Sequence, residues 1–167
     1  GPAPGYLITI PWELDALGGV SQVVTNLQRE LEHCGWSPTV LVSDWSAKRP
    51  RSASNALIRW RIRSPWPGEQ PFRGLIAFAL TLPSVGSTLR RLARRHDWRV
   101  VNVHSPELSA LSWIVLRWLG FWSGSIVLSV HGSDVREVIA HGGWVRLRLT
   151  RLLLERADAI IACAADL

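Results

Sequence analysis

Several residue types that define protein classes are scarce in this sequence of 167 residues. Cysteine occurs only at Cys34 and Cys163, which are far apart, and this argues against a disulfide framework and fits a reducing compartment. Uncharged stretches are short: the central one, residues 74–89, has 16 residues and contains Pro83. A bilayer-spanning helix needs roughly 20 apolar residues, so no transmembrane span is expected.

Methionine is absent as well, so the sequence lacks an initiator residue. Gly1-Pro2 resembles the scar that remains after an expression tag is cleaved. We therefore expect a trimmed piece of a longer protein in which residues 3–167 form a single domain. With 47% hydrophobic and 19% charged residues, the chain is too apolar to be disordered.

Acidic residues are scarce in the middle of the chain. Residues 48–99 contain 12 basic and 2 acidic residues, whereas the remainder contains 7 basic and 11 acidic residues. A concentrated basic segment indicates a polyanionic partner: phosphates, a nucleic acid or an anionic membrane face. Of the 19 basic residues 18 are arginine, and the chain has 10 tryptophans, a combination that suits the membrane interface.

Continuous apolar runs alternate with amphipathic segments along the chain. The predicted strands are residues 6–10, 39–43, 56–63, 100–104, 125–130 and 159–163. The predicted helices are residues 20–34, 74–96 with a break at Pro83, 106–122 and 143–156. This alternation predicts the α/β class: a Rossmann-like open, mostly parallel sheet with helices on both faces.

Ligands of such sheets bind beyond the carboxyl ends of the strands, and three loops are predicted there. In the first, Gly18-Gly19 precedes a helix, where backbone N–H groups can approach an anion, although paired glycines are also typical of an ordinary turn. The other two begin at His104 and His131, which end neighbouring strands and precede small residues. Asp134 is placed either to orient the His131 imidazole or to cap the next helix.

Other site classes lack their signatures. The run Leu17-Gly18-Gly19-Val20-Ser21 does not fit the GxGxxG fingerprint, which disfavours a nicotinamide-dependent oxidoreductase. The cysteines and histidines do not have metal-ligand spacing, so neither a metal nor a cofactor is expected.

Three segments together resemble the N-terminal domain of the family 4 glycosyltransferases, which have the two-domain GT-B fold. They are residues 18–44 (GGVSQVVTNLQRELEHCGWSPTVLVSD), residues 100–131 (VVNVHSPELSALSWIVLRWLGFWSGSIVLSVH) and residues 157–167 (ADAIIACAADL). The most specific fragment is HGSD at residues 131–134. The sequence departs from the family pattern at Trp36, where His is usual, and at Ala164, where Ser is common.

The resemblance implies transfer of a sugar from a nucleotide-sugar donor with retention of configuration and without a metal. It implies that Gly18 and Gly19 border the donor diphosphate and that His131 is the catalytic residue beside the transferred sugar. His104, Ser133 and Asp134 are expected to contact the acceptor or to support residues that do. The acceptor is expected to be a glycan or a lipid-linked molecule at the cytoplasmic membrane face.

The resemblance also implies a C-terminal donor-binding domain that residues 3–167 do not include, so this chain alone is expected to be inactive. The predicted membrane contacts are the following residues of the basic segment: Arg90, Arg91, Arg94, Arg95, Trp60 and Trp66. Nucleic acid is disfavoured as a partner because no recognition motif is present. A non-catalytic interaction module, whose Trp- and Arg-rich segment binds a membrane or a partner, stays as the alternative.

Overall fold

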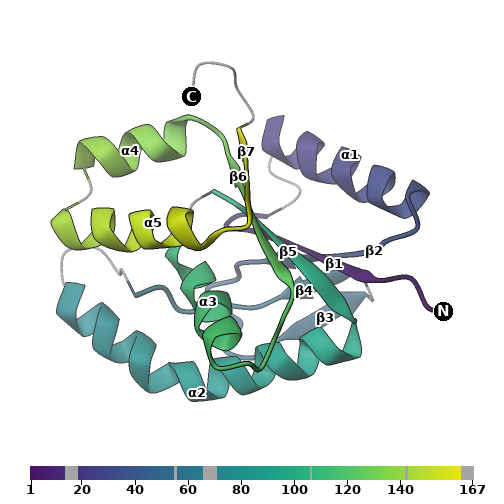
Figure 1. Ribbon diagram of the computed structural model, residues 1–167, viewed down its shortest axis with the longest axis horizontal. Helices are drawn as coiled ribbons and strands as arrows, with labels where there is room; N and C mark the ends of the chain where they lie inside the picture. Colours follow the sequence, from purple (N-terminus) through teal and green to yellow (C-terminus); the bar gives the residue numbers. More distant parts are fainter. Residues whose placement is uncertain (14–18, 55, 66–70, 106, 142, 163–167) are drawn as a thin grey trace.

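The computed structural model describes residues 1–13, 19–54, 56–65, 71–105, 107–141 and 143–162. They form one sheet of seven strands in the order β3-β4-β2-β1-β5-β6-β7. Every neighbouring pair is parallel except β3 and β4, which confirms the predicted fold class (Figure 1). The strands are β1 Gly5–Ile10, β2 Ser37–Val42, β3 Arg51–Ser54, β4 Leu57–Arg59, β5 Trp98–His104, β6 Ser125–Val130 and β7 Ala159–Ala162.

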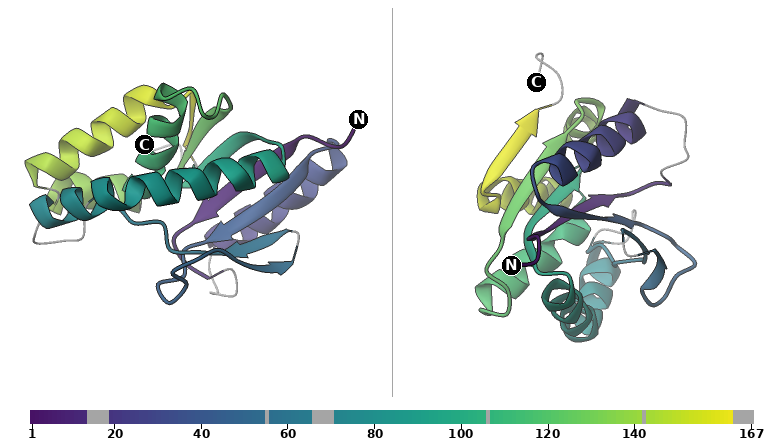
Figure 2. Two further views of the ribbon diagram at one scale, coloured as in Figure 1. Left: turned by 90° about the horizontal axis from the view of Figure 1, so that it is seen from below. Right: turned by 90° about the vertical axis from the view of Figure 1, so that its right-hand side faces the viewer.

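Helices cover both faces of this sheet, as predicted. They are α1 Gly19–His33, α2 Pro71–Arg95, α3 Leu111–Trp118 after the short 3-10 helix η1 Leu108–Ala110, α4 Ser133–His141 and α5 Trp144–Arg156. Seen end-on, α1 and α2 lie on opposite sides of the strands (Figure 2). Helices α2, α3 and α5 pack on the face opposite to α1, and the chain reverses its direction of travel across the sheet between β1 and β5. Ligands of open sheets bind near such a reversal point.

The hydrophobic core is divided by the sheet into two unequal parts. On the α1 face, Val24 packs with Ile8 and Val40 of the central strands. The opposite face holds the larger cluster, in which α2, α3 and α5 cover the strands and Trp113 is 1% exposed. The Trp113 ring lies between Trp98 and Trp122, with ring centroids at 6.0 and 4.9 Å. Trp98, Trp113 and Trp122 thus pack together in the hydrophobic core.

The basic edge of the sheet differs from its prediction. A strand over residues 56–63 was expected, but β4 ends at Arg59, and β3 lies at Arg51–Ser54, where no strand was predicted. The N–H of Trp60 still bonds to the Val42 carbonyl, whereas the N–H of Arg61 turns to the Ala47 carbonyl in the loop after β2. The strand ends there because its backbone leaves the sheet for that loop.

Helix α2 runs without interruption through Pro83, so the predicted break is wrong. Proline removes one backbone donor from the helix. Side-chain hydroxyls add bonds around it: Thr81 Oγ1 donates to the Ala77 and Phe78 carbonyls, and Ser84 Oγ donates to the Thr81 carbonyl. An 18-residue window within Phe72–Arg95 has a mean hydropathy of 1.3. By length and composition alone, this helix is long and apolar enough to cross a membrane. Leu89 and Ala93 nevertheless anchor this helix in the core.

The predicted helix of residues 106–122 is shorter than expected, and one helix was not predicted. Trp118 ends α3, and Gly120 then adopts a φ of 69°, a left-handed conformation that glycine tolerates without strain. Helix α4 begins at Ser133, inside the HGSD segment, and its residue Val138 is buried.

Candidate functional site

The carboxyl ends of β5 and β6 bring His104 and His131 into contact. His104 ends β5 and pairs in register with Ser129 of β6, so His131 follows the neighbouring strand by one residue. His104 Nδ1 and His131 Nε2 lie 3.1 Å apart, and the two rings are stacked with centroids at 5.3 Å. The sequence placed these histidines at neighbouring strand ends, and the structure places them side by side.

The two histidines differ in exposure. His104 is 1% exposed, whereas His131 is half-buried. Burial, reinforced by the proximity of His131, lowers the pKa of His104 to about 4, so His104 is neutral at neutral pH. A buried ring cannot touch an acceptor directly, so His104 can serve a ligand only through His131.

One hydrogen must lie between the two facing nitrogens. Either His104 Nδ1–H donates to His131 Nε2, or His131 Nε2–H donates to His104 Nδ1. In both cases the contact fixes the orientation of the His131 ring. His104 Nε2 is buried and has no hydrogen-bond partner among the described residues, which makes this ring a costly feature to keep in a core.

A second group of polar side chains lies on the α1 face of the sheet. Asn102, on the same face of β5 as His104, is 0% exposed. Its Oδ1 accepts a bond of 2.9 Å from Ser129 Oγ, and its Nδ2 donates to the Tyr6 hydroxyl at 3.3 Å. Burial raises the pKa of Tyr6, and the bond from Asn102 offsets part of that effect. These residues were not predicted from the sequence, although a lone Asn within the apolar run VVNVH was a signal for them.

Backbone turns of unusual conformation follow both strand ends. Ser105 has a φ of 66°, and its N–H bonds to the Ser129 carbonyl at 2.9 Å. Gly132 has a φ of 80° and connects His131 to α4. A non-glycine residue in the left-handed region is uncommon and often marks a functional site.

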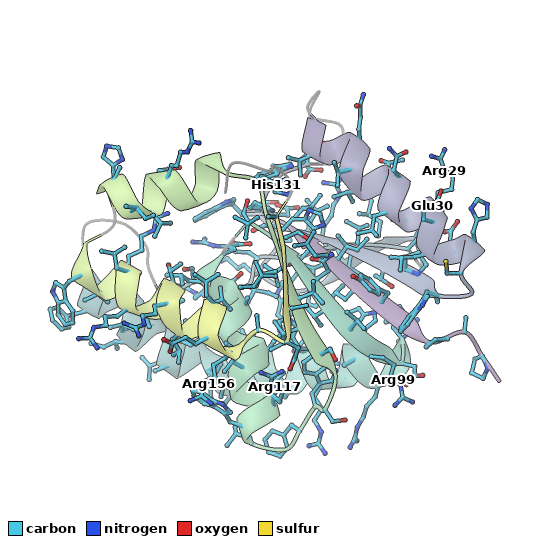
Figure 3. All side chains as sticks on the ribbon, turned by 45° about the horizontal axis from the view of Figure 1, so that its top comes forward. Arg29, Glu30, Arg99, Arg117, His131 and Arg156 are labelled. Atoms are coloured by element: carbon cyan, nitrogen blue, oxygen red, sulfur yellow. The ribbon has the colours of Figure 1, made fainter. Side chains whose placement is uncertain are left out.

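Two helix N-termini face the same edge. Helix α1 begins at Gly19, which is exposed, and a Cβ atom there would meet nothing within 4 Å. Figure 3 shows His131 beside the N-terminal end of α1, and Figure 1 shows α4 starting from the same edge. Unpaired N–H groups and the helix dipole favour an anion at such ends. Gly18 lies outside the described residues.

The HGSD segment supplies the start of α4. The helix begins at Ser133, so Asp134 lies within its first turn and does not precede the helix as a cap, contrary to one of the two readings of the sequence. A carboxylate in a first turn still interacts favourably with the helix dipole. The side chains of Ser133 and Asp134 lie outside the described part of the structure, so their predicted acceptor roles stay predictions.

The predicted membrane residues lie elsewhere, on and beside α2. Arg90, Arg91, Arg94 and Arg95 occupy the last turns of that helix. Trp60 is only 4% exposed and belongs to the core, so the prediction that it contacts a membrane is wrong. Trp66 falls outside the described residues.

Within the described ranges, no group of three or more His, Cys, Asp or Glu residues is arranged to hold a metal ion. Cys34 is exposed, and Cys163 lies outside the described residues.

A family profile for the glycosyl transferase 4-like domain matches residues 18–167. The chain belongs to this glycosyl transferase family. No curated protein sequence matches it.

Solved structures share the fold of this glycosyltransferase domain. Sucrose-phosphate synthase from Thermosynechococcus elongatus matches with a TM-score of 0.62 and 19% identity over 95% of this chain and 41% of that chain. A second structure of that synthase, comprising segments 27–220 and 406–426, matches with a TM-score of 0.54 and 16% identity over 97% of this chain and 77% of that chain. An α-glucosyltransferase in complex with UDP and a 13-mer DNA matches with a TM-score of 0.51 and 12% identity over 96% of this chain and 38% of that chain.

These structural matches establish the fold, and the family match establishes a glycosyltransferase-like domain. The chain spans about two fifths of the length of the first synthase chain.

Proposed function

We propose that this domain forms the acceptor side of a retaining glycosyltransferase, which moves a sugar from a nucleotide-sugar donor to a glycan or lipid-linked acceptor. The observation that carries the proposal is the contact of 3.1 Å between His104 and His131 at the carboxyl edge of the sheet. A buried neutral histidine that lacks a partner at Nε2 is expensive to maintain, and orienting a working His131 gives it a purpose.

The helix N-terminus supports a role for the first loop. The donor diphosphate would border Gly18 and Gly19, where the open space at Gly19 admits a phosphate close to the backbone. When the bond between the sugar carbon and the diphosphate oxygen breaks, negative charge grows on the diphosphate, and N–H groups stabilise that charge. The acceptor hydroxyl oxygen forms the new bond to the sugar carbon, and its proton passes to the departing diphosphate oxygen.

His131 would lie beside the transferred sugar. Since its Nε2 is occupied by His104, a contact of the ring with the sugar falls to Nδ1. His104, held neutral by burial, adds no positive charge beside His131 and acts as a positioning residue. No cofactor would take part besides the nucleotide-sugar itself. The donor-binding domain would lie outside residues 1–167, and the transfer would take place at the cytoplasmic face of a membrane.

The test uses the full-length protein that contains this chain and measures release of nucleotide from UDP- and GDP-sugars in the presence of candidate acceptors. We expect turnover with one donor, and a loss of roughly 10²-fold in the His131→Ala variant, the usual scale for a lost proton-transfer or positioning group. His141→Ala, at an exposed histidine at the end of α4, is the matched control and should retain full turnover.

Two results would contradict the proposal: no turnover with any nucleotide-sugar, or equal turnover in the two variants. A separate calorimetric titration of the 167-residue chain with the same donors should show no saturable binding, because the diphosphate is held mainly by the second domain. Tight binding would show that the donor site has been misplaced.

A further inference from the structure

The outward face of α2 is divided along the helix axis into an apolar half and a basic half. Phe72, Ile76 and Leu80 follow one another at four-residue spacing and are 71%, 60% and 77% exposed. The same face continues at the far end with Arg90 and Arg94. Large apolar side chains in such a row are seldom left in water without a partner.

A groove lies between this face and α3. It has a volume of about 610 Å³ and is lined by Ala79, Leu82, Pro83, Gly86, Ser87, Arg90, Arg91, Arg94, Val115, Leu116, Leu119 and Phe121. The walls are apolar, the three arginines lie at one end, and the lining contains no acidic residue. Leu119 and Phe121 of the lining are themselves exposed, and the exposed side chain of Trp118 extends the apolar surface beyond the groove.

Gly86 and Arg90 show how closely the groove is built. A Cβ atom on Gly86 would lie 3.3 Å from Leu116 Cδ2, so the glycine lets α2 approach α3 at the groove floor. The Arg90 guanidinium lies 4.8 Å from the centre of the Phe121 ring. Its Nε is buried and has no acceptor among the described residues, so a cation here is partly desolvated and lacks an anion.

We propose that this groove binds an anionic phospholipid of a membrane surface, with an acyl chain along the apolar wall and the phosphate on Arg90, Arg91 and Arg94. Arginine pairs with phosphate through its planar donor fork, and the apolar wall accounts for a chain attached to that phosphate. A free phosphate would leave the apolar wall uncovered. The inference goes beyond sugar transfer, since lipid binding does not depend on the histidine pair.

A second groove on the other side of α2 provides an internal comparison. It has a volume of about 860 Å³, lies between α2 and the β3–β4 edge, and its basic lining residues are Lys48, Arg49, Arg61, Arg63, Arg91 and Arg95. Arg61 stacks on the exposed Trp45 ring at 4.0 Å. It has more basic side chains than the first groove, but its walls are more polar, so a bilayer lipid should prefer the α2–α3 groove.

The experiment sediments the 167-residue chain with vesicles of phosphatidylcholine alone and of an equimolar mixture with phosphatidylglycerol. We expect binding to the anionic vesicles and little binding to the neutral ones. The Arg90→Gln/Arg94→Gln variant should bind anionic vesicles at least tenfold more weakly, since each arginine near an anionic surface contributes measurably. Arg61→Gln/Arg63→Gln removes the same charge from the second groove and should bind like the original chain.

A second pair of variants tests the acyl-chain part of the inference. Leu119→Glu puts a carboxylate into the groove at a side chain that is 59% exposed, and it should reduce vesicle binding without unfolding the domain. Ile139→Glu makes the same change on α4, at 68% exposure, and should have no effect. Circular dichroism is the control that tests whether all four variants are folded.

Each contrary outcome overturns the inference. Equal losses from the two arginine pairs would show general charge attraction, and binding that ignores lipid charge would remove the phosphate contact. Full binding by Leu119→Glu, or complete displacement by soluble glycerol phosphate, would show that the acyl chain does not occupy the groove. If a short DNA duplex released the chain from anionic vesicles, and added vesicles did not restore the binding, the arginines would be assigned to nucleic acid instead.

Discussion

The two faces of β5 and β6 are made from the same strands but have opposite chemistry. Toward α2 and α3, Val101 and Leu128 are fully buried among apolar side chains. Toward α1, Asn102 and Ser129 are just as buried but are polar and bonded to one another. Alternate residues of a strand point to opposite faces, so a single step along the chain separates the stabilising core from the face that carries Asn102 and His104.

This difference shows that burial of side chains on the polar face is less favourable in free energy than burial on the apolar face. An apolar side chain gains free energy simply by leaving water, whereas a buried polar group must find a partner to break even. His104 finds only one described partner, at Nδ1. The side chains on the polar face thus contribute less to the free energy of folding than those on the apolar face. The polar face also lies next to the proposed catalytic edge.

The largest effect is expected on the apolar face. Trp113→Ala should lower the free energy of unfolding by about 3–5 kcal/mol, because it leaves a cavity between Trp98 and Trp122 in the core. Urea unfolding at neutral pH measures it. Trp144→Ala, at a side chain that is 73% exposed, should change the free energy by less than about 0.5 kcal/mol. Similar losses for both variants would contradict the assigned core.

The next effect belongs to His104 and depends on pH. The imidazole binds a proton near pH 6.5 when unfolded and at about 4 when folded, so between these values the unfolded state holds more protons. Stability is therefore complete above about pH 6.5 and falls as the pH drops toward 4, by about 3 kcal/mol in all.

Urea unfolding between pH 4 and pH 7.5 tests the pH dependence of His104. The His104→Gln variant should lose that part of the pH dependence, whereas His141→Gln at an exposed position should keep it. A pH profile of His104→Gln that parallels the original chain would show that the buried imidazole is not the titrating group.

Topology made the site partly predictable from the sequence. Continuous apolar runs identified most of the parallel strands, and parallel strands bring their carboxyl ends to one edge, so His104 and His131 were expected near each other. The direction of their contact, through Nδ1 and Nε2, depends on side-chain torsions that no spacing encodes. The Asn102–Ser129 bond likewise joins residues 27 positions apart through the strand register.

Features that depend on lateral packing were harder to predict. The break at Pro83 follows a local rule, but α2 continues through it, with Leu89 and Ala93 packed in the core. Trp60 was assigned to a membrane, yet its alternation with Arg59 and Arg61 already placed it on the face opposite to the arginines, which is the core face. The groove between α2 and α3 arises where two helices meet, and the sequence of one helix does not reveal it.

The smallest effect is expected from the hydrogen bond between Ser129 and Asn102 on the polar face. Ser129→Ala removes the donor to Asn102 Oδ1 and should cost about 1–2 kcal/mol, since the acceptor stays buried without its partner. The double variant Asn102→Leu/Ser129→Ala removes both members, and it should cost less than the sum of the two single variants, because neither polar group is then left unsatisfied. Ser46→Ala, at an exposed serine bonded to Asp44, is the control and should be within about 0.5 kcal/mol of the original chain. Additive losses in the urea-unfolding cycle would mean that Asn102 and Ser129 do not depend on one another, and the polar face would then differ from the apolar one in composition only.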